Sequence, residues 1–124
     1  MCSKFLSSER LRVLEKILRL TQEENLVLLV EGRKDKKVLE EFGFRKILTL
    51  SGKPLHTIPT LVKGEVAILT DFDREGERLR RKLLKLLCSS KLRINSLLPK
   101  LFYALGIKKL EEAKNLTKKA FVQN

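Results

Sequence analysis

The stretch Ile68-Leu69-Thr70-Asp71-Phe72-Asp73-Arg74-Glu75-Gly76-Glu77 constrains the fold more than any other part of the chain. It is an apolar run that ends in two aspartates one residue apart, followed by two glutamates around a glycine. Alternate residues of a strand point to the same face, so Asp71 and Asp73 are expected to converge where a buried strand ends. Carboxylates this close repel one another unless a cation lies among them, and Mg²⁺ or Mn²⁺ is the kind of cation that oxygen ligands suit. The alternative is a solvated acidic turn at the start of a helix, which the helix dipole favours.

A second apolar run, Leu26 to Val30, also ends in an acid, Glu31, which is followed by Gly32. The residues between the two runs have a helical pattern. This layout is typical of neighbouring parallel strands joined by crossover connections, whose carboxyl ends face one crevice. We therefore expect Glu31, Asp71 and Asp73 to meet in space.

With both runs considered together, the chain resembles the Toprim domain family. Val30-Glu31-Gly32-Arg33-Lys34-Asp35 resembles the Glu-Gly-x-x-Asp signature of that family, and Asp71-Phe72-Asp73-Arg74-Glu75-Gly76-Glu77 resembles its Asp-x-Asp signature in the extended form of type IA topoisomerases. Toprim domains also occur in DnaG-type primases, OLD-family nucleases and small ribosomal-RNA maturation nucleases. The resemblance covers about residues 25–95 of a predicted single domain, 1–124, with an N-terminal helix in 1–24 and C-terminal helices in 96–124. In length the chain is most similar to the small stand-alone Toprim proteins.

The resemblance implies roles for individual residues. Asp71 and Asp73 would coordinate Mg²⁺ or Mn²⁺, and Glu75 would add a ligand if a second ion binds. Glu31 would be the general acid/base or share a metal, so the implied catalytic set is Glu31, Asp71 and Asp73. Four further residues are expected to hold the catalytic and metal-binding side chains in place without touching the metal themselves: Gly32, Asp35, Gly76 and Glu77.

Basic residues near the two motifs are candidates for holding phosphate groups. The candidates are Arg33, Lys34, Lys53, Arg74, Arg78, Arg81 and Lys82. Lys53 is included because the loop after the second strand borders the site in Toprim proteins, although Ser51-Gly52-Lys53-Pro54 also has the composition of an ordinary turn. Arg78, Arg81 and Lys82, with Lys85, recur at helical spacing and predict either a phosphate-binding face or a solvated one.

The charge balance points to a polyanionic partner. The chain has 27 lysines and arginines against 15 aspartates and glutamates, a net charge of +12. Such a balance favours nucleic acid first and an anionic membrane second, although Lys-rich surfaces also serve solubility and thermostability. Five of the 15 acids lie in the two motifs, which predicts an acidic site within a basic surface.

The predicted fold is α/β, a Toprim-like (Rossmann-like), mainly parallel sheet of about four strands with helices on both faces. We expect strands at 26–30, 45–50, 65–70 and, on a weaker pattern, 91–95, and helices at 8–20, 33–42, 57–63, 75–87, 96–105 and 108–121. Cys88 and Tyr103 are predicted to lie in the core. The chain shows neither a signal-peptide pattern nor an apolar run long enough to span a bilayer, so a cytoplasmic protein with no membrane partner is expected.

These patterns lead to a functional hypothesis of metal-dependent phosphodiester chemistry on nucleic acid, most consistent with a small Toprim nuclease acting on RNA or DNA. A non-catalytic nucleic-acid binding module or scaffold, in RNA processing or in DNA replication and repair, is the alternative. Primase-like nucleotidyl transfer ranks last, because no additional domain for holding a template and primer is seen. The patterns leave open RNA against DNA, one metal ion against two, and assembly as a homodimer or within a larger complex.

Overall fold

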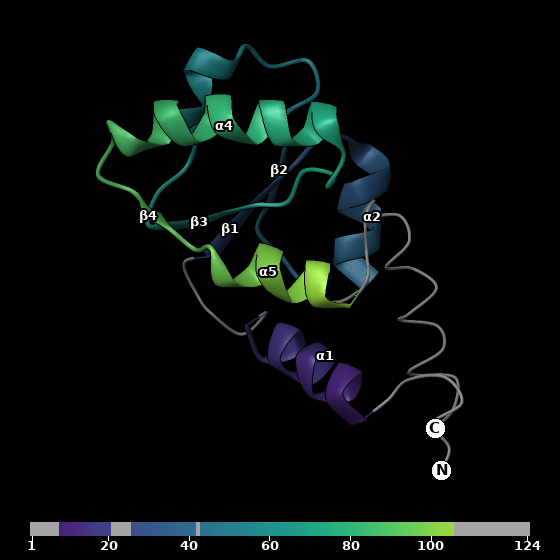
Figure 1. Cartoon of the computed structure of the whole chain (residues 1–124). Coiled ribbons are helices and arrows are strands. Elements are labelled where there is room, and N and C mark those ends of the chain that lie inside the picture. The colour runs from purple at the N-terminus through teal and green to yellow at the C-terminus, as the bar shows by residue number, and fades with distance from the viewer. Residues whose placement is uncertain (1–7, 21–25, 42, 106–124) are drawn as a thin grey trace.

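The structure is a computed structural model that describes residues 8–20, 26–41 and 43–105. Along the chain, helices and strands alternate (Figure 1). The helices are α1 (Ser8–Leu20), α2 (Arg33–Glu41), the 3₁₀ turn η1 (Leu55–Thr57), α3 (Ile58–Leu61), α4 (Arg74–Cys88) and α5 (Leu97–Ala104). The strands are β1 (Leu26–Val30), β2 (Ile47–Thr49), β3 (Glu65–Ile68) and β4 (Arg93–Ile94).

The four strands form one sheet in the order β2-β1-β3-β4, and every neighbouring pair is parallel. In the inner pair, Leu26 lies opposite Glu65 and Leu29 opposite Ile68, so β1 and β3 end at the same edge. The outer strand β4 pairs with the start of β3, Arg93 lying opposite Glu65. The predicted parallel α/β sheet is confirmed, and it brings the carboxyl ends of β1, β2 and β3 together.

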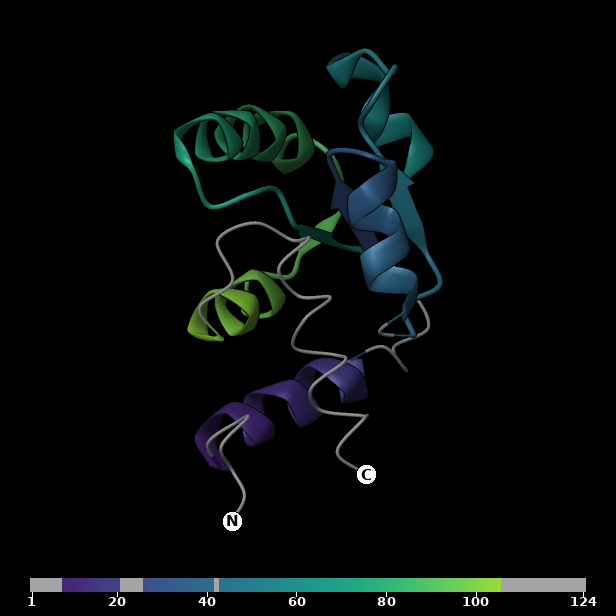
Figure 2. The same ribbon diagram turned by 90° about the vertical axis from the view of Figure 1, so that its right-hand side faces the viewer.

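Alternation along the inner strands divides the core into two layers, one on each face of the sheet. Leu28 and Val30 of β1 face α1, α2 and α5, whereas Leu29 faces α3 and α4. Figures 1 and 2 show α4 on the opposite side of the strands from α1 and α5. Because both faces are covered, β1 is apolar throughout and β3 is apolar after Glu65, as expected for a parallel sheet.

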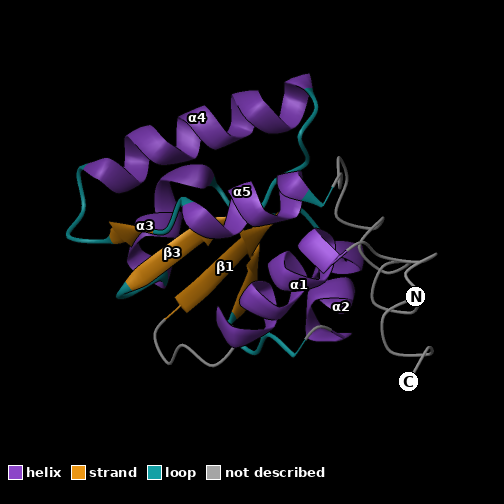
Figure 3. Ribbon diagram, turned by 60° about the horizontal axis from the view of Figure 1, so that its bottom comes forward, coloured by secondary structure: helices purple, strands orange, loops and turns teal. Residues whose placement is uncertain are grey.

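The helices before and after the predicted Toprim core pack together on one side of the sheet. Ile17 of α1 is fully buried in the same cluster as Leu98 and Phe102 of α5, and α1 lies against α5 (Figure 3). The sequence left sheet packing and a dimer interface open for these segments, and the structure shows α5 packed on β3 and α1 packed on α5. The predicted helix at 108–121 lies outside the described residues. Among the helices that the structure describes, none is long and apolar enough to cross a bilayer.

Two residues predicted to be in the core are exposed. Cys88, the last residue of α4, is exposed because the buried positions of that helix are Leu83 and Leu87, and Cys88 lies off this stripe. Tyr103 is 64% exposed for the same reason. The apolar stripe of α5 and the turn that follows it comprises Leu98, Leu101, Phe102 and Leu105, and Tyr103 falls between its members.

Candidate active site

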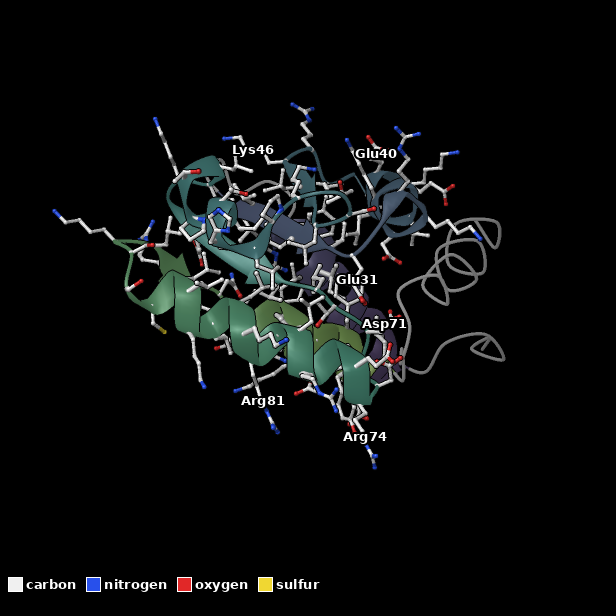
Figure 4. The ribbon with its side chains drawn as sticks, turned by 90° about the horizontal axis from the view of Figure 1, so that it is seen from above. Glu31, Glu40, Lys46, Asp71, Arg74 and Arg81 are labelled. Carbon is white, nitrogen blue, oxygen red and sulfur yellow. The ribbon has the colours of Figure 1, made fainter. Side chains whose placement is uncertain are left out.

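Glu31 lies where three strand ends meet. Its main-chain carbonyl accepts a hydrogen bond from the Ser51 N–H beyond β2 (3.1 Å), and its carboxylate oxygen Oε2 accepts one from the Asp71 N–H beyond β3 (3.1 Å). The first acidic signature is therefore in direct contact with the second, across residues far apart in sequence. Figure 4 shows Glu31 and Asp71 side by side.

The strand β3 ends earlier than the predicted 65–70. It is a strand only to Ile68, although the Leu69 N–H still donates to the Leu29 carbonyl at 2.8 Å. Asp71 and Asp73 consequently lie in the loop between β3 and α4, and strand alternation does not set their directions. The loop and the start of α4 set them instead.

The carboxylate of Asp73 caps α4. Its Oδ1 accepts a hydrogen bond from the Gly76 N–H at 2.8 Å, which satisfies one of the free donors of the first turn. The buried hydroxyl of Thr70 donates to the Gly76 carbonyl at 3.0 Å. These two bonds hold the first turn of α4 against the loop that carries the aspartates.

The close approach of the first turn of α4 to the loop that carries the aspartates requires glycine at position 76. A Cβ built at this position would overlap the main-chain carbonyl of Asp71, whose carbon would lie only 2.7 Å away. By contrast, a Cβ at Gly32 would meet nothing within 4 Å. The glycine of the second signature thus allows a helix to approach the backbone of a site residue closely.

The remaining acids of the motifs differ in their surroundings. Asp35 Oδ2 accepts a hydrogen bond from the Gly32 N–H at 3.2 Å, so Asp35 holds the turn that carries Glu31. Glu75 is exposed in the first turn of α4. Glu77 pairs with Arg80 of its own helix at 3.8 Å.

The surroundings of Glu31 favour its protonated form. Burial raises the pKa of this carboxyl above its usual range, and the neighbouring carboxylates of Asp71, Asp35 and Asp73 raise it further. The hydrogen bond from the Asp71 N–H lowers the pKa but does not cancel the rise. Negative charge is therefore concentrated around Glu31 at the carboxyl ends of the strands.

This donor set suits a hard divalent cation in part. Within the described ranges, no three histidine, cysteine, aspartate or glutamate side chains are gathered closely enough to form a complete metal cluster. Mg²⁺ commonly takes only one or two protein carboxylates and completes its coordination with water and substrate phosphate. The oxygen-only chemistry of Glu31, Asp71 and Asp73 fits such an ion. So do the neighbouring carboxylates, which add to the effect of burial in raising the Glu31 pKa.

The predicted phosphate contacts are distributed unevenly around the acids. The Nζ of Lys53 donates to the main-chain carbonyl and the hydroxyl of Thr49, at 2.9 and 3.2 Å, so its ammonium group holds the loop after β2. Arg33 and Lys34 are exposed in the first turn of α2. In Figure 4, Arg74 and Arg81 project outward from α4 and away from Glu31 and Asp71.

An aromatic pair beside the acids was not anticipated. Phe72, between the two aspartates, packs against the core on the α5 side of the sheet. Its ring meets that of Tyr103 edge to face, with centroids 5.3 Å apart and planes at 61°. The sequence signal was available, because Tyr103 lies off the apolar stripe of its helix.

Comparison with known proteins identifies the family. The model of the Toprim domain matches residues 26–100. A protein of Thermococcus onnurineus named "UPF0292 protein" is 39% identical over 92 residues, which are 72% of this chain and 69% of the relative. A protein of the same name from Thermococcus sibiricus is 37% identical over 92 residues, covering 72% of this chain and 73% of the relative. These names state no activity.

Structure comparison agrees. A solved protein from Aquifex aeolicus superposes with a TM-score of 0.71 at 28% sequence identity, over 82% of this chain and 94% of that one. Toprim domains in general belong to metal-dependent enzymes that act on nucleic acids, typically with Mg²⁺. The fold, the paired acidic signatures and the family match agree, and the chain belongs to the Toprim domain family.

Proposed function

We propose that this protein is a metal-dependent nuclease that cleaves phosphodiester bonds of RNA or DNA at the edge where β1 and β3 end. The contact between the Glu31 carboxylate and the Asp71 N–H carries the proposal, because it joins the two acidic signatures into one site. The net charge of +12 supplies the attraction for a polyanionic substrate.

In this proposal Asp71 and Asp73 hold Mg²⁺ or Mn²⁺, and Glu75 adds a ligand if a second ion binds. The bound ion would polarise the phosphoryl oxygen and promote ionisation of an attacking water. Asp73 retains its role at the start of α4, because its second carboxylate oxygen is not the one that accepts from the Gly76 N–H. Asp35 and Gly76 fix the loops that carry the acids.

Glu31 is proposed to move the proton. During hydrolysis the attacking water loses a proton and the departing oxygen gains one. A carboxyl whose pKa is raised towards the working pH exchanges protons more effectively than an ordinary glutamate. The direction of the Glu31 pKa shift supports this role.

A cleavage assay tests the proposal. Labelled single- and double-stranded RNA and DNA would be incubated with Mg²⁺, Mn²⁺ or EDTA, with wild type, Asp71→Asn, Asp73→Asn and the control Glu40→Gln, an exposed acid of α2. We expect cutting that needs the metal, is retained by Glu40→Gln and falls by about 10²-fold or more in either aspartate variant, the scale of losing one strong electrostatic contact in an active site. In Asp73→Asn the new carboxamide oxygen can still accept the helix-capping bond, so far-UV circular dichroism should be unchanged.

Retained cutting in Asp71→Asn would contradict the nuclease proposal. Binding without cutting in every metal, equal in wild type and both variants, would instead identify a nucleic-acid binding module with a Toprim fold.

A further inference from the structure

Tyr103 is unusual among the exposed side chains of the described residues. Three large hydrophobic side chains are substantially exposed there, Leu61, Leu97 and Tyr103, and Tyr103 is the most exposed at 64%. It is also the only one of the three with an aromatic ring. Residue 103 lies just beyond the residues that the family model matches, 26–100.

The position of Tyr103 is fixed by its neighbours. The preceding residue, Phe102, is fully buried, and α5 packs against both α1 and β3. On the outer side, the Tyr103 ring meets Phe72 edge to face at 5.3 Å. Phe72 is itself half-buried against the core, so its contact holds the Tyr103 ring in place and leaves most of that ring exposed.

The aromatic pair adjoins the acids directly. Phe72 is bonded to both Asp71 and Asp73, and adjacent Cα atoms are about 3.8 Å apart. The exposed basic residues of α4 lie on the opposite side of the sheet from α5. The loop that carries the acids thus lies between the aromatic pair on the α5 side of the sheet and helix α4, whose basic side chains project outward on the other side.

We propose that Phe72 and Tyr103 form a stacking surface for an unpaired nucleobase, and that the site therefore takes single-stranded or locally unpaired nucleic acid. Proteins that bind single strands without regard to sequence combine exposed aromatic rings with positive charge, and this chain has a net charge of +12. Within a duplex both faces of each internal base are covered by stacking, so Tyr103 can stack on an unpaired base but not on a base inside a duplex. This inference rests on the proposed function, because it names the class of substrate for the same site.

The composition of the chain makes the contact directly observable. The chain has one tyrosine and no tryptophan, so the ring signals of selectively labelled tyrosine in NMR spectra report on Tyr103 alone. Titration would use a short single strand of mixed sequence, as DNA and as RNA, and the same strand annealed to its complement. EDTA would be present so that binding is measured without cleavage.

Stacking predicts upfield shifts of the Tyr103 ring signals with the single strand and none with the duplex. In parallel, fluorescence anisotropy of the labelled strand would give its Kd for wild type and variants. Tyr103→Ala should weaken single-strand binding about 5- to 150-fold, the equivalent of about 1–3 kcal/mol per stacked base. Tyr103→Phe should bind like wild type, and so should Leu97→Ala, which removes an exposed apolar side chain at the other end of α5.

Equal effects of Tyr103→Ala on single strand and duplex, or no effect on either, would overturn the inference. Its failure is separable from failure of the proposed function. Single-strand stacking without cleavage in any metal would retain the stacking surface and refute the nuclease. Metal-dependent cleavage of a duplex, at a rate that Tyr103→Ala does not change, would support the nuclease and refute the stacking surface.

Discussion

Gly76 shows how one atom can connect the fold to the site. Alanine within a helix is ordinarily more stable than glycine by about 0.5–1 kcal/mol. At position 76 the sign should reverse, because the added Cβ would overlap the Asp71 carbonyl. We expect Gly76→Ala to lower the free energy of unfolding by about 1–3 kcal/mol, the usual cost of forcing a carbon into a packed region.

Gly32→Ala is the matched control for this substitution, measured by urea denaturation. Gly32 lies in the first acidic signature, a Cβ there meets nothing within 4 Å, and its φ is not positive. Its free energy of unfolding should change by less than about 0.5 kcal/mol. Equal changes for the two variants would show that the close approach of α4 to Asp71 is not what Gly76 provides.

Glu31 connects charge at the site to stability. Its pKa is raised in the folded protein, first by burial and then by neighbouring carboxylates. A raised carboxyl pKa means that the folded state binds the proton more tightly than the unfolded state does. The contribution of Glu31 to stability is therefore greatest below the unfolded pKa, about 4.3, and falls as the pH rises through the folded pKa.

A neutral residue at position 31 should remove that dependence. Glu31→Gln keeps an oxygen to accept from the Asp71 N–H but has no proton to lose. Without metal, urea denaturation at pH 7–8 should give the variant a higher free energy of unfolding than wild type, by less than about 1 kcal/mol because the half-buried group is partly solvated. The difference should vanish below about pH 4. A variant less stable than wild type at neutral pH would show that the Glu31 charge is stabilising without a cation.

Among the elements, α4 performs two tasks on two faces. Leu83 and Leu87 bury one face against the sheet, while Arg78, Arg81, Lys82 and Lys85 are exposed on the other. The spacing of these residues predicted both faces from the sequence. The spacing did not predict the directions in which Arg74 and Arg81 point. Those directions depend on the hydrogen bonds that hold the first turn of α4 against the loop that carries the aspartates.

If the basic residues on the outer face of α4 contact the phosphate backbone of the nucleic acid, removing their charges should make binding less dependent on salt concentration. Each phosphate contact on a single strand contributes about 0.7 to the slope of log affinity against log salt concentration. Arg81→Ala/Lys82→Ala should therefore lower the slope by about 1.4. Arg93→Ala is the control, because Arg93 is exposed where β3 and β4 begin, at the other edge of the sheet. A comparable loss of slope per residue in the control would indicate a diffuse attraction instead of a track along α4.

The other helices show where patterns succeed and where they mislead. Helix α1 was predicted with the bounds that the structure has, and the short β4 was found at its weak signal. Tyr103 and Cys88 were predicted to lie in the core because their neighbours are apolar, and the helical stripe excludes both. Counting apolar neighbours in sequence ignores the 100° turn per residue that decides which side chain faces the sheet.

Across the whole molecule, the topology was predictable and the fine geometry of the site was not. Two buried runs joined through helices imply parallel strands with adjacent ends, and this alone predicts that Glu31 and Asp71 meet, as the structure shows. The orientation of Asp73 depends on its capping hydrogen bond with the Gly76 N–H. The position of the Lys53 ammonium depends on its hydrogen bond to the Thr49 carbonyl. Such local hydrogen bonds compete with functional contacts for the same side chain, and a motif does not reveal which contact is made.

The proposed function requires that the acids at the ends of β1 and β3 hold a divalent ion, and a Mn²⁺ titration measures this binding without any substrate. Free Mn²⁺ would be titrated by electron paramagnetic resonance against wild type, Asp71→Asn and the control Glu40→Gln, with nucleic acid absent. We predict a saturable site in wild type and in the control, weakened about 10-fold or more in Asp71→Asn, and competed by Mg²⁺. Equal Mn²⁺ affinity in wild type and Asp71→Asn would show that Asp71 does not hold the ion.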